Sequence, residues 1–129
     1  MKAKIFWFTG LSGAGKTSIA ESSKIELEMK GFSVLILDGD AVRSNYHRDL
    51  GFTEEDIKKN NRLIAQICVD NLRKYQVIMV PIISPFTESR NKARHIFGKN
   101  FFEIYCKVKI ETVVERDTKG LYAKAKSGE

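Results

Sequence analysis

The sequence FWFTGLSGAGKTSIA (residues 6–20) joins an apolar segment to a glycine-rich segment and then to a helical pattern. The apolar segment begins at residue 4 and stops at Thr9, as expected of a strand that is buried on both faces. Gly10, Gly13 and Gly15 follow, and a lysine and a threonine come directly after the last glycine. The sequence therefore predicts a strand, a tight glycine-rich turn and a helix, in that order.

The glycine segment satisfies the pattern G-x-x-x-x-G-K-[ST] of a phosphate-binding loop, or P-loop. Glycines let backbone N–H groups approach phosphate oxygens, and the helix that follows adds the positive end of its dipole. We expect Lys16 to bridge the β- and γ-phosphates and the Thr17 hydroxyl to ligate Mg²⁺. A chance glycine turn is disfavoured because a strand precedes it and a helix follows. The expected nucleotide contacts are Gly10, Ser12, Gly13, Ala14, Gly15, Lys16, Thr17 and Ser18.

Composition indicates an ordinary soluble globular protein. The chain has 129 residues, of which 43% are hydrophobic and 29% charged, which suits one domain with its own core. No apolar run approaches the roughly 20 residues of a membrane helix, and the start MKAKIFWF is interpreted as a core strand rather than a signal peptide. The net charge of +6 is spread along the chain without a nucleic-acid motif, so we expect a small-molecule nucleotide rather than nucleic acid or membrane as partner.

The cysteines and histidines match no metal motif. Cys68 and Cys106 are expected to be buried thiols in a reducing cytoplasm, although a disulfide is left open. His47 and His95 are isolated and are expected at the surface or in loops.

Strand and helix patterns alternate along the chain. This order predicts right-handed crossovers and an α/β fold in three layers, the P-loop NTPase fold, with a parallel sheet flanked by helices on both faces. Thr53 is expected to cap one helix, and a second capping residue is expected at the start of the helix at 87–97. Expected strands are 4–9, 33–38, 76–83 and 101–108, and expected helices are 16–30, 53–75, 87–97 and 111–117, with a short helix within the connection at 39–52.

Three segments that follow strands are expected to meet at one edge of the sheet: 10–17, 38–43 and 84–86. A GTPase would carry the motif N-K-x-D, but NKAR at 91–94 lacks the aspartate. A motor ATPase usually carries an acidic residue at the end of a long apolar strand, but no acidic residue directly follows the expected strand at 76–83. The acids Asp38 and Asp40 instead follow the second strand, where small-molecule kinases keep a carboxylate that activates the acceptor. The alternative for both is a turn-forming role.

Five stretches in order resemble the adenylylsulfate (APS) kinase family: GLSGAGKT, LDGDAVR, DLGFTEED, ISPFTESR and ERDTKGLYAKAKSGE. The resemblance implies a single P-loop kinase domain over 1–129, with a lid segment at 119–129. It also implies ATP and Mg²⁺ as cofactors, and transfer of the γ-phosphate to the 3′-hydroxyl of adenosine 5′-phosphosulfate in sulfate activation. The assembly is not readable from the sequence, and a homodimer is left open.

The resemblance assigns roles on the acceptor side. Asp40 resembles the acid that orients or deprotonates the hydroxyl, with Asp38 beside the substrate. Arg43 resembles the arginine that grips the phosphosulfate. Phe52 resembles the aromatic that packs on the acceptor's base, and Asn60 the substrate asparagine. Arg43 and Arg90 are left open as solvated residues, and Phe52 as a core residue.

The resemblance also assigns roles to residues that follow the expected strand at 76–83 and to residues at the lid. Ser84 matches a serine sometimes assigned as a phosphoenzyme intermediate, with substrate positioning as an equal alternative. Phe86 is expected to wall the acceptor pocket, with a core role as its alternative. Arg116 and Lys119 resemble lid cations that close on phosphates.

Two departures from the family pattern leave other functions open. The family reads D-R-x-E-N-I-R-R where this chain has DIKKNNRL (residues 56–63), so Ile57 replaces the substrate-binding arginine and Lys59 a glutamate. Isoleucine cannot grip an anion, so Lys58 or Lys59 compensates, or the acceptor is another nucleotide-linked molecule such as cytidine diphosphoramidate. The family also continues past Glu129 with more of the lid, which leaves open a nucleotide-binding module without efficient chemistry.

Overall fold

The computed structural model describes residues 2–10, 15–38, 53–82 and 86–106. The elements in chain order are β1 (Lys4–Thr9), α1 (Lys16–Met29), β2 (Val34–Ile36), α3 (Glu54–Asn71), β3 (Val77–Pro81), α4 (Thr87–Phe97), the short 3-10 helix η1 (Gly98–Asn100) and β4 (Phe101–Tyr105).

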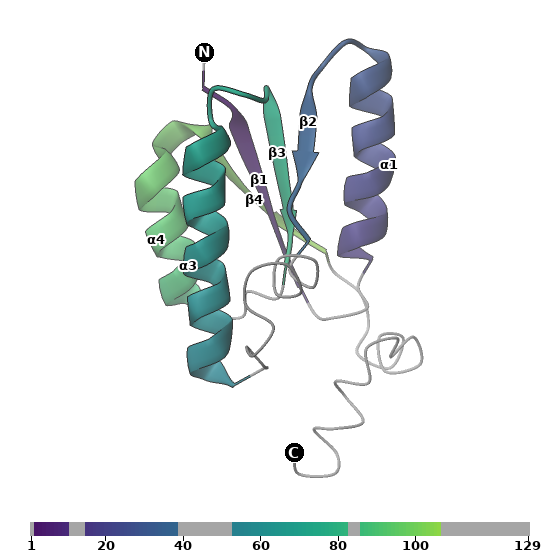
Figure 1. Ribbon diagram of the computed structural model, residues 1–129. Coiled ribbons are helices and arrows are strands. Elements are labelled where there is room, and N and C mark those ends of the chain that lie inside the picture. Colours follow the sequence, from purple (N-terminus) through teal and green to yellow (C-terminus); the bar gives the residue numbers. More distant parts are fainter. Residues whose placement is uncertain (1, 11–14, 39–52, 83–85, 107–129) are drawn as a thin grey trace.

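The four described strands form one parallel sheet in the order β2-β3-β1-β4 (Figure 1). Strand β1 is central in this sheet: Lys4 is in register with Val77 of β3, and Ile5 with Phe101 of β4. Such central parallel strands have both faces buried, which explains why β1 and β3 are nearly continuous apolar runs. The predicted α/β fold with a parallel sheet is confirmed.

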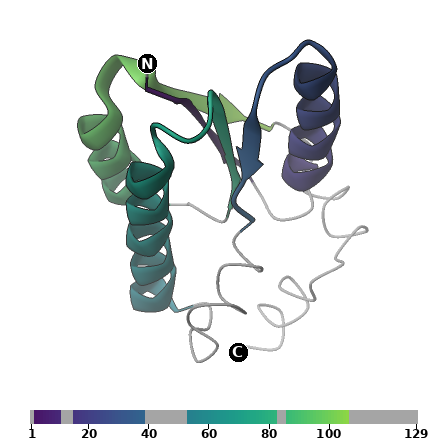
Figure 2. The same cartoon turned by 45° about the horizontal axis from the view of Figure 1, so that its top comes forward.

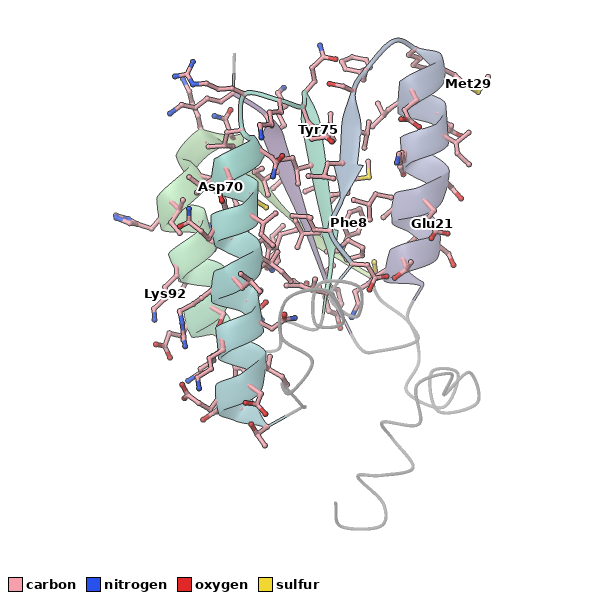
Figure 3. The ribbon with its side chains drawn as sticks, viewed as in Figure 1. Phe8, Glu21, Met29, Asp70, Tyr75 and Lys92 are labelled. Carbon is pink, nitrogen blue, oxygen red and sulfur yellow. The ribbon has the colours of Figure 1, made fainter. Side chains whose placement is uncertain are left out.

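Alternate residues of β1 supply two separate cores, because successive side chains of a strand point to opposite faces. Trp7 is fully buried in a cluster with Ile64 of α3 and Ala93 of α4. Phe8 belongs to a second cluster with Ala20 of α1, and its side chain lies between the sheet and α1 (Figure 3). Helices α3 and α4 thus cover one face and α1 the other, which confirms the expected three layers (Figure 2).

Helix α3 begins as its sequence predicts. The Thr53 hydroxyl accepts a hydrogen bond from the backbone N–H of Asp56 at 3.1 Å, and three acidic residues fill the first turn. The helix ends at Asn71 instead of residue 75, and the Leu72 carbonyl that follows accepts a hydrogen bond from Ala3 N–H at 2.8 Å, just before β1. Within the described residues, no helix combines the length and the apolar character of a membrane span.

Some expected boundaries differ from the structure. The strands expected at 33–38, 76–83 and 101–108 are shorter, since they end at Ile36, Pro81 and Tyr105. The second capping prediction is wrong: α4 begins at Thr87 itself, after Phe86, which has no capping side chain. The Thr87 hydroxyl instead accepts a hydrogen bond from Arg90 at 3.2 Å.

Three expectations lie outside the described residues: the short helix within 39–52, the helix at 111–117 and the lid at 119–129. The single domain with its lid therefore stays a prediction.

His95 is described and lies exposed on α4, as expected.

Both cysteines are free and buried, so the expected thiols are confirmed. They lie in different layers, Cys68 in the cluster beneath α3 and Cys106 in the cluster beneath α1. Burial raises the pKa of the Cys68 thiol to about 12. Burial also raises the pKa of Cys106, although the nearby Lys16 charge opposes that shift.

The pKa of Cys68 predicts a loss of stability in alkali. The folded protein keeps the thiol proton between pH 9.0 and about 12, whereas the unfolded chain releases it. The free energy of unfolding should therefore fall as pH rises in this window, by at most about 1.4 kcal/mol per pH unit from this group. Urea denaturation across the window should show a shallower pH dependence for Cys68→Ala, even though its stability is lower throughout.

Cys106→Ala is the comparison variant: it removes the other thiol, whose pKa burial also raises, and should keep the contribution of Cys68 to the pH dependence. An identical pH dependence in the wild type and Cys68→Ala would contradict this assignment.

Candidate nucleotide-binding site

The candidate site lies where the strands end and α1 begins. All four described strands are parallel, so their carboxyl ends meet at one edge of the sheet. Gly10 follows β1, Asp38 lies two residues beyond β2, and Cys106 follows β4. The first turn of α1 lies at the same edge (Figure 1). This edge is where open α/β sheets bind their ligands.

The first and last glycines of the loop are required for different reasons. Gly10 has φ +129°, and a Cβ built there would lie 2.6 Å from the backbone oxygen of Cys106. Gly15 has φ +94° and is the N-cap of α1, but no described atom lies within 4 Å of its Cβ position. Gly10 therefore needs both an unusual backbone conformation and space, whereas Gly15 needs only the conformation.

Lys16 connects the two ends of the loop. Its side chain is largely buried, and its Nζ donates a hydrogen bond to the Gly10 carbonyl at 2.7 Å. Helix α1 begins at Lys16 and has no acidic residue in its first turn. First-turn N–H groups have no acceptor within their own helix, so this end of α1 combines amide donors, a positive dipole end and an ammonium group. The arrangement suits a phosphate group.

Thr17 and Asp38 bring oxygen atoms together beside the loop. The Thr17 hydroxyl donates a long hydrogen bond, 3.5 Å, to Oδ2 of Asp38. Mg²⁺ prefers oxygen ligands and is usually held by one or two protein groups together with phosphates and water. The pair fits such an ion, and the described residues contain no larger cluster of His, Cys, Asp or Glu that could hold a metal.

Asn60 and Phe86 lie on the elements that follow. Asn60 of α3 is 2% exposed, and its Oδ1 has no hydrogen-bond partner among the described residues. Buried acceptors normally have partners, and the expected contact of Asn60 with the substrate stays a prediction. Phe86 is half-buried, and its ring centroid lies 5.3 Å from Nζ of Lys58.

The structure brings together only part of the expected set. Gly10, Gly15, Lys16, Thr17 and Asp38 lie around the first turn of α1, and Ser18 is exposed in that same turn. The other expected site residues lie outside the described residues and keep their roles as predictions: Ser12, Gly13, Ala14, Asp40, Arg43, Phe52, Ser84, Arg116 and Lys119.

The structure describes the segment in which this sequence departs from the family pattern that it resembles, where Ile57 stands in place of an arginine. Ile57 is buried, with 8% exposure. Lys58 does not replace an anion-binding arginine, since its Nζ lies 3.1 Å from Glu88 and 4.0 Å from Glu54. Lys59 is exposed. Arg90 is not simply solvated either, because it pairs with Glu103 of β4 at 3.3 Å.

Sequence reasoning missed two contributors. Cys106 contacts the phosphate loop through its backbone: its carbonyl packs on Gly10 and its N–H donates to the Thr9 carbonyl at 2.8 Å. Only the strand order, which places β4 beside β1, could have indicated this contact. The contact of Lys58 with Phe86 was also missed, because it joins two helices far apart in the sequence.

Substitution of the two glycines should have unequal effects. Gly10→Ala should lower the free energy of unfolding by about 2 kcal/mol or more, because the Cβ meets backbone and the conformation is strained. Gly15→Ala meets no described atom and should cost only about 1 kcal/mol. Urea denaturation of both variants measures the difference, and an equal or reversed order would contradict the close packing of Gly10 on Cys106.

Removal of the Thr17 hydroxyl should weaken the contribution of Mg²⁺ to nucleotide affinity. Thr17→Val keeps the side-chain shape, and we expect the gain in ATP affinity on adding Mg²⁺ to shrink roughly tenfold, as is typical when a metal site loses a ligand or its support. Calorimetric titration with ATP, with and without Mg²⁺, measures this gain. Ser22→Ala, which removes an exposed hydroxyl farther along α1, is the control and should match the wild type. A full Mg²⁺ effect in Thr17→Val would refute the assignment.

Comparison with known proteins places this geometry in a family. A family model described as adenylylsulphate kinase matches residues 2–129. The chain is 43% identical to the adenylyl-sulfate kinase of Bacillus licheniformis, over 99% of this chain and 66% of that protein. It spans about two thirds of the length of the curated relatives it matches.

Solved structures agree with this comparison. The Mycobacterium tuberculosis APS kinase in complex with AMPPNP and APS superposes with a TM-score of 0.89 at 39% identity, covering 98% of this chain and 75% of that chain. A hexameric APS kinase from Thiobacillus denitrificans has a TM-score of 0.69 at 30% identity, covering 84% of this chain and 24% of that chain. On the phosphate loop, the parallel sheet and these matches together, the chain belongs to the adenylylsulphate kinase family.

Proposed function

We propose that this protein is an ATP-dependent kinase that phosphorylates the 3′-hydroxyl of adenosine 5′-phosphosulfate. The observation that carries the proposal is the hydrogen bond of Lys16 to the Gly10 carbonyl, which holds the lysine ammonium group at the start of α1, between the two ends of the glycine-rich loop. Membership of the adenylylsulphate kinase family supports the choice of reaction. The ligands of the M. tuberculosis relative, AMPPNP and APS, support the choice of substrates.

The chain's own groups would act by position and charge. Phosphoryl transfer passes through a loose transition state, so catalysis consists mainly of alignment and electrostatic stabilisation. Lys16 and the amides of α1 would hold the β- and γ-phosphates. Thr17 and Asp38 would hold Mg²⁺, which neutralises phosphate charge when bound.

The transfer itself needs no covalent chemistry from the protein. The acceptor oxygen forms a bond to the γ-phosphorus, and the bond from that phosphorus to the oxygen bridging to the β-phosphate breaks, so that ADP leaves. The proposed role of Asp40 is to orient the acceptor hydroxyl and to take its proton.

A second candidate keeps the fold and changes the acceptor. Ile57 is a buried apolar residue at the family's arginine position, and Lys58 is already paired with Glu88. Neither side chain offers the bidentate grip that an arginine gives a phosphosulfate. This observation favours another nucleotide-linked acceptor, such as cytidine diphosphoramidate.

Compartment and assembly are also proposals. The free, buried thiols of Cys68 and Cys106 support a reducing cytoplasm. A homodimer, which the sequence leaves open, is one candidate assembly, and the hexamer of the T. denitrificans relative is another. Light scattering of the purified protein decides between a dimer and other states.

A panel of acceptors tests the reaction directly. The protein is incubated with ATP, Mg²⁺ and one acceptor at a time, ADP release is coupled to a detector, and each product is identified by mass spectrometry. We expect turnover of adenosine 5′-phosphosulfate to its 3′-phosphorylated product, and its loss in Lys16→Ala.

Other outcomes separate the alternatives. Turnover of a different nucleotide, but not of adenosine 5′-phosphosulfate, would establish the second candidate. If ATP raises the melting temperature but no acceptor yields more ADP than the Lys16→Ala background, the protein is a binding module without efficient chemistry.

A further inference from the structure

The backbone and the ring of Phe86 are restrained by different contacts. It is the last residue before α4, and its carbonyl accepts hydrogen bonds from Ser89 N–H at 3.1 Å and Arg90 N–H at 3.3 Å. These bonds fix its backbone at the start of the helix. They do not fix the ring, which rotates about bonds beyond the backbone.

Within the described part of the chain, α3 supplies a contact that restrains the ring. Nζ of Lys58 lies 5.3 Å from the centroid of the Phe86 ring, within the range of a cation–π interaction. The same ammonium group donates a hydrogen bond to Oε2 of Glu88 at 3.1 Å and lies 4.0 Å from Glu54. The side chain of Lys58 is only 23% exposed. Lys58 is thus held between an acid of α4, an acid of α3 and the aromatic ring.

The charges of this cluster reinforce one another. The hydrogen bond to Glu88 raises the pKa of Lys58, and it lowers the pKa of Glu88. Glu88 has a second partner, Lys92, at 3.3 Å. Lys92 lies on the surface of α4 away from the sheet (Figure 3). The two lysines therefore share one acid, while the ring contact involves Lys58.

We infer that Lys58 is a positioning residue that fixes the Phe86 ring and so sets the affinity for the acceptor. The inference rests on the proposed function and on the role expected of Phe86 from the sequence, which is to wall the acceptor pocket. Lys58 does not substitute for the missing arginine at position 57, because its charge is already paired. It instead provides affinity indirectly, by holding an apolar surface in place for the acceptor's base. The described ends of the nucleotide loop, Gly10 after β1 and Gly15 before α1, are not part of this cluster.

Three variants separate the ring contact from the ion pair. Lys58→Met removes the charge and keeps an unbranched chain, Lys58→Arg restores a cation, and Lys92→Met removes the other partner of Glu88 without touching the ring. We expect Lys58→Met to raise the acceptor KM about threefold to fivefold, the equivalent of one exposed cation–π interaction, with kcat and the KM for ATP unchanged. Lys58→Arg and Lys92→Met should match the wild type.

Two kinetic outcomes would overturn the inference. One is an unchanged acceptor KM in Lys58→Met. The other is an equal rise in Lys92→Met, which would assign the effect to Glu88 or to helix packing rather than to the ring. Thermal melting of each variant confirms that the proteins compared are folded.

A readout without turnover separates this inference from the proposed function. 4-Fluorophenylalanine is introduced at position 86, and the fluorine NMR signal is recorded in the wild type, Lys58→Met and Lys92→Met proteins without ligand. A signal that shifts in Lys58→Met and not in Lys92→Met supports the restraint on the ring. A signal that does not shift in Lys58→Met refutes it. If the wild type turns over no acceptor, the proposed function fails, and the ring signal alone decides whether Lys58 orients Phe86.

Discussion

The close packing of Gly10 against the backbone of Cys106 is the constraint on which the candidate site depends. The carbonyl of Cys106 occupies the space where a Cβ would project, so only glycine lets the chain leave β1 in this direction. Lys16 then reaches back to the Gly10 carbonyl and joins the end of the loop to its beginning. The Gly10 end of the phosphate loop is therefore packed against the backbone that follows β4, and the buried ammonium group of Lys16 joins the far end of the loop to Gly10.

The parallel arrangement of the strands brings other residues of the candidate site to the phosphate loop. Because the four described strands are parallel, the residues that follow them arrive at the same edge of the sheet. Asp38 reaches Thr17 in this way, although 21 residues separate them in the chain. The two layers of helices are supported by separate cores on the two faces of the sheet. The site thus depends on the sheet as a whole and not on the loop alone.

Local sequence patterns predicted those features whose causes are local. The cap at Thr53, the first apolar strand and the conformations of Gly10 and Gly15 at the two ends of the glycine motif are each set by nearby residues, and the structure agrees with these predictions. The end of α3 was mispredicted: the chain leaves the helix after Asn71, and the Leu72 carbonyl bonds to Ala3, which is distant in the sequence. The contacts of Lys58 with Glu88 and Phe86 could not be predicted from the sequence either, because they depend on α3 and α4 lying side by side. Acidic residues after the second strand were predicted to approach the loop, and for Asp38 the distance to Thr17 agrees.

The central claim is that Lys16 and the first turn of α1 form a site for the phosphates of ATP. A crystal structure of the protein with AMPPNP and Mg²⁺ tests it most directly. The account predicts that Nζ of Lys16 moves from the Gly10 carbonyl to a phosphate oxygen, with the amides of the first turn of α1 donating to the same phosphates. A nucleotide bound elsewhere, with Lys16 still bonded to Gly10, would contradict it.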